Sequence, residues 1–430
     1  MGKLVFFTRH AFALPLAAAM LIPKPAFAQV AVADSGDTAW MMVCAMLLLL
    51  AALPGLVLRL AGSSSAHDAL SATGRNIGIA ASVSLAWAIA AYSLIYAPGS
   101  AWLGGGGNLL LSNLSALRDG MTVPESAFVL FQMSLAILAA CLVSGAVLGR
   151  ASAGWMTIFA PLWLLLVYVP VARWTWGGGW LAGLGVMDFA GGLVIHLCAG
   201  FSALSLALIA GRNRPGAGGG HSPLLAMTGG ALVWLGSAGS VGGWALGATD
   251  DAAAAILNGH FAACAGALGW MALEKILSGR ATATGAISGA LAGIAAIAAS
   301  AALVGTGGAM LIGLAAALTC RGAIGFARRA VDDPAHIFVL HGIGGLVGIL
   351  LLPLFVLPLM GGVGFDAAIS LSGAILSQII GLIVVILWSM MGTAIAALLI
   401  SVVLPLRASP EQEEAGLDIS LHGEQAWDFR

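Results

Sequence analysis

The chain has 430 residues, of which 60% are hydrophobic and only 8% are charged. A soluble domain carries about 25% charged residues, so this composition excludes an ordinary soluble globular protein. The formal net charge of −1 gives no basic surface for nucleic acid, and no nucleic-acid partner is expected.

The first 28 residues have the pattern of a signal peptide. Lys3 and Arg9 precede the apolar run AFALPLAAAMLI, and small residues stand at Ala26 and Ala28 as in an A-x-A cleavage site. We therefore expect residues 1–28 to be removed, which places the mature amino terminus outside the membrane. The rest of the chain then divides into a transmembrane domain, 29–406, and a tail, 407–430.

Eleven apolar segments follow, each long enough for a spanning helix of about 20 residues. They lie near residues 38–60, 75–97, 124–148, 152–172, 188–211, 224–247, 252–274, 281–303, 306–325, 335–359 and 370–405. The sequence thus predicts an all-α membrane protein of 11 transmembrane helices, surrounded by membrane lipid.

Positive charge is distributed unequally between the two sets of loops. Arg118 and Arg173 lie in loops on the amino-terminal side of the membrane. The opposite loops and the tail carry twelve, namely Arg59, Arg75, Arg150, Arg212, Arg214, Lys275, Arg280, Arg321, Arg328, Arg329, Arg407 and Arg430. Because lysine and arginine favour the cytoplasmic side, we predict an outer amino terminus and an inner carboxyl terminus in the inner (plasma) membrane.

An internal repeat links the fifth and tenth segments. Asp188 precedes His196 by eight residues, and Asp333 precedes His341 by the same spacing. The two segments cross in opposite directions, so each histidine lies ~12 Å inside its own end, near the midplane. This predicts an inverted 5+5 pseudo-repeat followed by a long final helix, a known transporter layout. The alternative is two unrelated histidines that pack against other helices.

Several ordered segments resemble the ammonium transporter (Amt/Rh) family, of the bacterial Amt type. They are GDTAWMMVCAMLLLLAALPGL, FQMSLAILAACLVSGAV, YVPVARWTWGGGWL, MDFAGGLVIHLCAG, VDDPAHIFVLHGIGGLVG, GGVGF and the tail EEAGLDISLHGEQAW. The resemblance covers nearly all of the chain after residue 28. It implies a homotrimer in which each subunit gathers ammonium at an outer vestibule, removes a proton and passes ammonia through an apolar pore.

The resemblance also assigns roles to single residues. His196 and His341 match the family's twin pore histidines, Asp188 its buried aspartate and Trp176 its vestibule tryptophan. Asp188 also begins a helix, where a carboxylate caps free N–H groups, so capping and stabilisation of an arriving cation both remain open. The face of the Trp176 ring can attract a desolvated cation.

The entrance departs from the family pattern. Phe131 and Gln132 open the third-segment motif and are included among the pore residues. The family usually places two phenylalanines below the vestibule, and these positions are Leu135 and Ser240 here. Trp244 stands where the family has a small hydroxyl residue. Trp176 and Trp244 then form either a two-sided cation–π site or a plug.

Two further histidines have weaker assignments. His336 stands where the family usually has an acid, and it either extends a proton relay below the twin histidines or faces a loop. We interpret His260, in the seventh segment, as a packing residue.

The tail, 407–430, carries five acids between Glu411 and Glu424 and no spanning segment. By resemblance it is a cytoplasmic regulatory tail that receives a PII-type signal protein. No nucleophile–base pair or metal cluster indicates an enzyme, and no cofactor or metal is expected. Alternatives to transport of ammonium and ammonia are an Amt-like ammonium sensor, a channel for methylamine or another small neutral molecule, and a proton-coupled carrier of an organic solute.

Overall fold

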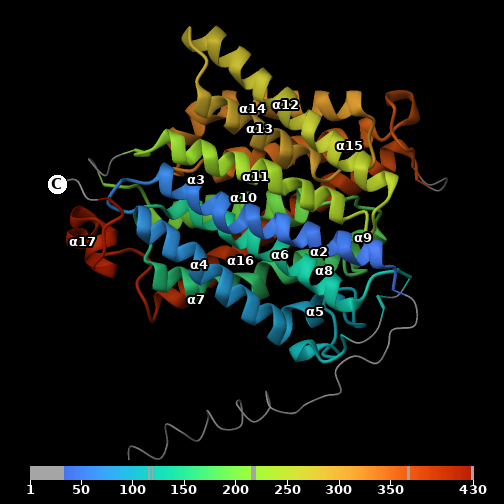
Figure 1. The fold of residues 1–430 in the computed structure, drawn as a ribbon, viewed down its shortest axis with the longest axis horizontal. Coiled ribbons are helices and arrows are strands. Elements are labelled where there is room, and N and C mark those ends of the chain that lie inside the picture. Colours follow the sequence, from blue (N-terminus) through green and yellow to red (C-terminus); the bar gives the residue numbers. More distant parts are fainter. Residues whose placement is uncertain (1–32, 115–116, 119, 215–218, 366–368, 428–430) are drawn as a thin grey trace, which may run out of the picture.

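The computed structural model describes residues 33–114, 117–118, 120–214, 219–365 and 369–427. Within these residues, ten helices are long and apolar enough to cross a membrane. Most of these helices lie side by side along the longest axis of the molecule (Figure 1). The signal peptide predicted for residues 1–28 lies outside the described residues.

The first five spans include several broken helices. Their elements are α2 Ser35–Leu50, η1 Ala51–Gly55, α3 Leu56–Ser63, α4 Ala69–Ala86, η2 Trp87–Ala91, α5 Tyr92–Tyr96, α6 Glu125–Ser144, η4 Gly145–Val147, α7 Ala153–Trp163, η5 Leu164–Tyr168, α8 Val169–Thr175, α9 Trp180–Gly183, η6 Gly192–Leu197 and α10 Cys198–Ala210. The short η3 Leu109–Leu111 lies in the connection before α6.

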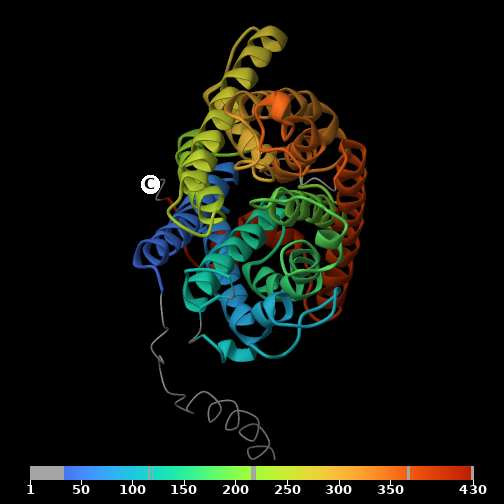
Figure 2. The same cartoon turned by 90° about the vertical axis from the view of Figure 1, so that its right-hand side faces the viewer.

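The second half begins after residue 222. Its elements are α11 Pro223–Gly243, α12 Asp250–Ser278, α13 Ala283–Ile297, α14 Thr306–Ala330, η7 Phe338–Ile343, α15 Gly344–Phe355, η8 Pro358–Met360, α16 Leu371–Ser401, α17 Pro410–Ala415 and η9 Asp418–His422. Seen end-on, the blue-to-green and yellow-to-orange helices form two neighbouring groups, and the red α16 lies along one side (Figure 2).

Polar residues mark where many of these helices begin. A side-chain oxygen at the N-cap accepts a hydrogen bond from a backbone N–H of the first turn. This occurs at Asp34, Ser152, Ser222, Thr249, Thr282 and Ser370. The ends of apolar segments are therefore set by single polar residues in an otherwise hydrophobic sequence.

The eighth predicted span, near 281–303, is shorter than expected. Its helix α13 has 15 residues, fewer than a full bilayer crossing requires. The helix ends early because the carbonyls of Ala298 and Ala299 accept hydrogen bonds from Ala190 and Phe189 in the loop before η6. Ten spans are therefore observed in the described residues, and the count of eleven stays a prediction.

Arg59 and Arg75 were expected in loops but lie in helices, whereas Arg150 lies in a connection as expected, and all three side chains are buried. Arg59 lies in α3 and Arg75 in α4, whereas Arg150 lies in the turn after η4. Arg75 donates to the carbonyls of Val147 and Ala151 at 3.3 and 3.2 Å. The distribution of positive charge along the sequence predicts an orientation in the membrane, but it does not reveal that a guanidinium is buried in the bundle and donates to backbone carbonyls.

The C-terminal segment is attached to the end of the bundle near α4 (Figure 1). The Asp418 carboxylate accepts hydrogen bonds from the N–H groups of Leu70 and Ser71 in the first turn of α4, at 3.0 and 2.7 Å. The Glu413 carboxylate accepts two hydrogen bonds from Arg407, at 2.5 and 2.9 Å. These bonds raise the pKa of Arg407 above its usual value.

Candidate functional site

Asp188 organises the loop that leads into the fifth span. Its carboxylate accepts hydrogen bonds from the N–H groups of Gly191, Leu193 and Val194, at 3.1, 3.0 and 2.9 Å. Gly191 has a left-handed backbone with φ of 100°, which glycine adopts without a steric penalty. The cap and the left-handed turn together allow a helix to begin inside the molecule.

Asp333 builds the matching loop before the tenth span. Its carboxylate accepts a hydrogen bond from the N–H of Phe338 at 2.7 Å. The residue three positions after each aspartate is left-handed, which is Gly191 in the first loop and His336, with φ of 57°, in the second. The repeat found in the spacing of aspartate and histidine therefore extends to backbone conformation.

His196 and His341 meet inside the bundle. The Nδ1 atoms of the two rings lie 3.0 Å apart, and the rings are nearly parallel, at 16° with centroids 5.1 Å apart. Both side chains are buried. Because a neutral imidazole has one donor and one acceptor nitrogen, one ring donates from Nδ1 and the other accepts.

Each histidine lies on a π-helical turn, η6 or η7, where the regular α-helical hydrogen bonds are interrupted. The glycines that follow let the two helices cross closely. A Cβ on Gly200 would lie 2.2 Å from the backbone N of Gly342, a distance that only glycine permits. Backbone contact at this crossing is what brings the two imidazoles within hydrogen-bond distance.

A small cavity of 20 Å³ lies beside the histidine pair. This volume suits about one water-sized molecule. Apolar side chains from several helices form most of the wall, and the polar groups are few: Ser237, Ser240, His196 and His341. The Ser240 hydroxyl donates to the carbonyl of Ala190 at 3.2 Å, so it is already partnered.

Three aromatic rings form a cluster above this region. The Trp176 and Trp244 rings lie 4.3 Å apart at 47°, and the Phe131 and Trp244 rings lie 6.1 Å apart at 74°. Trp176 donates from Nε1 to the carbonyl of Asp188 at 2.9 Å, which ties the cluster to the capped loop. Trp244 Nε1 is buried and has no partner in the described residues.

Gln132 and Leu135 occupy neighbouring turns of α6, and both are fully buried. Neither amide atom of Gln132 has a hydrogen-bond partner in the described part of the chain. Buried amides are rarely left unpaired, so this side chain suits a bound water or a polar ligand. Leu135 belongs to the hydrophobic core and is not among the residues that line the 20 Å³ cavity.

His336 and His260 make their contacts outside the histidine pair. His336 accepts at Nε2 a hydrogen bond from Arg328 at 3.1 Å, since arginine has no acceptor. His336 also lines a cavity at the end of the bundle. His260 is exposed and packs its ring against Trp234, with centroids 5.5 Å apart, so its packing is on the outer surface of the bundle.

Comparison with known proteins places this chain in a family. Residues 39–427 match the model of the Ammonium Transporter Family. The chain belongs to the ammonium transporter family. A putative ammonium transporter of Methanothermobacter thermautotrophicus is 36% identical over 92% of this chain and 98% of its own length. The ammonium transporter of Bacillus subtilis is 35% identical over 91% of this chain and 98% of its own.

Solved structures of similar proteins share the architecture. A sensor Amt protein superposes with a TM-score of 0.84 at 26% identity, covering 90% of this chain and 98% of that one. Mep2 of Candida albicans gives 0.80 at 29% identity, over 88% of each chain. The protein is thus a multi-pass membrane protein of a transporter family that acts on ammonium.

Sequence reasoning missed two features of this region. The first is the left-handed backbone of His336. Nothing in the sequence reveals it, because the matching position in the other loop is a glycine, Gly191. The buried Arg59 was counted only as a positive charge. The spacing from Asp188 to His196 equals that from Asp333 to His341. This equality is the signal from which the two matching loops could have been predicted together.

Proposed function

We propose that the protein transports ammonium by binding it at the Trp176–Trp244 cluster, removing a proton and passing ammonia along the histidine pair. The observation that carries this proposal is the 3.0 Å contact between His196 and His341 beside an apolar cavity. Moving a whole cation through hydrocarbon costs at least several kcal/mol, whereas ammonia is small and neutral.

The histidine pair suits a neutral substrate that both donates and accepts hydrogen bonds. Linked imidazoles leave one Nε2 as acceptor and the other as donor, so an ammonia molecule finds complementary partners in turn. The released proton either returns to the outer water or passes along the linked imidazoles. Electrical current during transport separates these two routes.

Two features favour the predicted placement of the protein. The positive loops favour an outer amino terminus and a carboxyl terminus in the cytoplasm. The family membership favours a homotrimer in the inner membrane, with residues 29–406 as the transmembrane domain. The attached acidic segment after Arg407 would offer a PII-type protein a surface at the inner face.

The test is an ammonium jump across proteoliposomes that contain the purified protein. His196→Ala and His341→Ala should each abolish or sharply change the pH shift and the current, because the pair is then broken. His260→Ala is the matched control, since that ring is exposed on the outer surface. Transport in both pore variants at the level of the control would rule out the histidine pathway.

An ammonium sensor is the second candidate, and the position of Trp244 favours it. The Trp176 and Trp244 rings lie 4.3 Å apart, so a cation bound at their outer face passes inward only after one side chain rotates, which slows conduction without preventing binding. A protein that binds ammonium but conducts slowly would bind it tightly in equilibrium dialysis and show little flux in proteoliposomes. Fast flux in wild type would exclude the sensor.

A further inference from the structure

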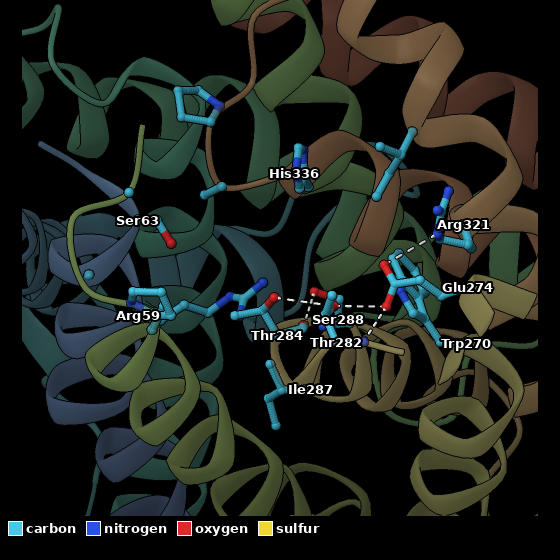
Figure 3. A pocket seen from close by; sticks show the side chains of 18 of the residues that line it. Arg59, Ser63, Trp270, Glu274, Thr282, Thr284, Ile287, Ser288, Arg321 and His336 are labelled. Carbon is cyan, nitrogen blue, oxygen red and sulfur yellow. Dashed lines mark hydrogen bonds and ion pairs between the residues drawn. The ribbon is translucent and has the colours of Figure 1, made fainter. Parts of the chain in front are cut away.

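A cavity of 460 Å³ opens at the end of the bundle that carries the C-terminal segment. Gly62 and Ser63 at the end of α3 line it, and His67, four residues later, accepts a hydrogen bond at its carbonyl from Asp418. The cavity is separate from the 20 Å³ cavity beside the histidine pair, with which it shares no lining residue. Figure 3 shows the side chains that surround it.

Arg59 is the most unusual residue of this wall. Its side chain extends into the cavity toward Thr284 (Figure 3). Arg59 is only 6% exposed, and no hydrogen bond or ion pair within the described residues satisfies its guanidinium. Asp333 stabilises the charge of Arg59 from a distance, but no acceptor contacts the guanidinium, so its N–H donors are open to an anionic acceptor from the cavity.

The other charges of the wall do not supply that acceptor. Glu274 is already engaged, because it lies 3.6 Å from Arg321 and accepts two hydrogen bonds from Thr282 at 2.8 Å. Arg328 is partnered only by the neutral ring of His336. Three arginines less one glutamate leave the lining with a charge of +2.

Uncharged donors complete the site. Helix α13 begins at this cavity, with Thr282 as its N-cap and Thr284 and Ser288 among the lining residues. The positive end of a helix dipole favours negative charge, and the Glu274 carboxylate already accepts two hydrogen bonds from Thr282 at this helix start. The start of α13 supports an anion site because the guanidinium of Arg59, which has no hydrogen-bond partner in the described residues, lines the same cavity.

We propose that this cavity binds a phosphoryl group, using Arg59, Arg328 and the first turn of α13. The oxygens of a phosphoryl group match the fork of N–H donors on a guanidinium, and its negative charge suits a lining that is positive overall. The phosphoryl group belongs either to a soluble phosphate ester, for which 460 Å³ gives room, or to a lipid headgroup at the membrane surface.

The first test measures binding of inorganic phosphate to the protein in phosphatidylcholine nanodiscs, at constant ionic strength set with sodium chloride. Wild type should show saturable binding by calorimetry and a matching rise in melting temperature. Arg59→Gln and Arg328→Gln should each weaken binding about tenfold, as expected for a hydrogen bond to a charged group. Arg280→Gln is the matched control, because that arginine is exposed and does not line the cavity.

A second arm separates the two sources of the phosphoryl group. Nanodiscs that contain phosphatidic acid should block phosphate binding if a lipid headgroup occupies the cavity, and should leave it unchanged if the ligand is soluble. Absence of saturable binding of both phosphate and phosphatidic acid overturns the proposal. So does equal binding by wild type, Arg59→Gln and Arg328→Gln.

Stability of the variants does not limit the test. If Arg59→Gln does not fold, Arg328→Gln and Thr284→Val, which lie at more accessible positions, keep the same criteria. Both faces of a nanodisc are open to solvent, so binding is measured without transport. A negative result here therefore leaves the proposed pathway past His196 and His341 untouched, and failure of transport leaves this site untouched.

Discussion

Trp244 is the residue on which the two hypotheses for cation entry differ, because its ring contacts those of both Phe131 and Trp176. If the two tryptophans bind a cation together, Trp244→Ser should shift preference from methylammonium toward ammonium. A ring face compensates the lost hydration of the methylated ion better than a hydroxyl does. Relative uptake of the two ions in wild type and variant measures this.

The plug hypothesis gives a different result for the same variant. Removing a plug raises the rate for both ions and leaves their ratio constant. An unchanged ratio together with an unchanged rate would show that Trp244 does not control entry. Trp180→Ser, outside this three-ring cluster, is a suitable control.

Two substitutions of Asp188 distinguish its role as a helix cap from a role of its negative charge. Asp188→Ala removes three hydrogen bonds to Gly191, Leu193 and Val194, and should lower the free energy of unfolding by about 1–2 kcal/mol. Asp188→Asn keeps an acceptor and should retain most of that stability. If the charge assists an arriving cation, Asp188→Asn should still reduce ammonium affinity, measured by equilibrium dialysis. Affinity at the wild-type level in the stable Asn variant would leave capping as its only role.

At the scale of elements, the crossing of α10 with η7 is the contact that positions the histidines. Gly200→Ala would place a methyl group 2.2 Å from the backbone of Gly342, so the helices must separate. We expect a loss of about 1–3 kcal/mol in stability and a longer distance between His196 and His341. Thermal unfolding in detergent gives the first quantity, and a cryo-EM structure of the variant gives the second.

Gly322→Ala is the matched control for that experiment. Gly322 lies in α14, and a Cβ there has nothing within 4 Å. Alanine should therefore stabilise the helix by about 0.5–1 kcal/mol. Equal melting temperatures for the two variants would contradict the close-crossing argument.

The sequence predicts that the spanning helices exist better than it predicts where each helix ends. The length of an apolar segment is a local property of the sequence. So is the equal spacing of the two aspartate–histidine pairs, Asp188–His196 and Asp333–His341. The interruption of α13 depends on carbonyls at Ala298 and Ala299 that bond a distant loop. Such pairing is tertiary, so hydrophobicity alone extended the eighth span too far.

The candidate site divides in the same way. The type and spacing of the histidines indicated a pair, but the ring contact between Trp176 and Trp244 could only be offered as one of two alternatives. The free guanidinium of Arg59 was not predicted, because a charged residue near the end of an apolar segment is normally solvated. Burial depends on neighbours from α11, α13 and α14 that the local sequence does not reveal.

At the scale of the whole molecule, the C-terminal segment is part of the folded structure. Deletion of residues 408–430 removes the Asp418 cap on α4 and the Glu413 contact of Arg407. We expect the subunits to assemble still, since the spans are unchanged, and a PII-type protein to lose its binding surface. Co-purification with such a protein and size-exclusion chromatography test the two expectations.

A point variant sharpens that test. Asp418→Ala keeps the length of the segment but releases it from α4, whereas Glu414→Ala removes an exposed acid of equal charge. Only Asp418→Ala should weaken capture of the PII-type protein. Equal capture by both variants and by the deletion would place the docking surface elsewhere.

The helices differ greatly in length, and this has a consequence for the distance that a solute travels. At ~1.5 Å per residue, the 31 residues of α16 extend about 46 Å, enough to reach both headgroup layers. The 18 residues of the span Phe338–Phe355 extend only about 27 Å. The other span that carries a pore histidine, Gly192–Ala210, has only 19 residues, so both helices beside the histidine pair are shorter than a bilayer core of about 30 Å. A thin central barrier raises permeability directly, because diffusive flux varies inversely with the length of the dry path.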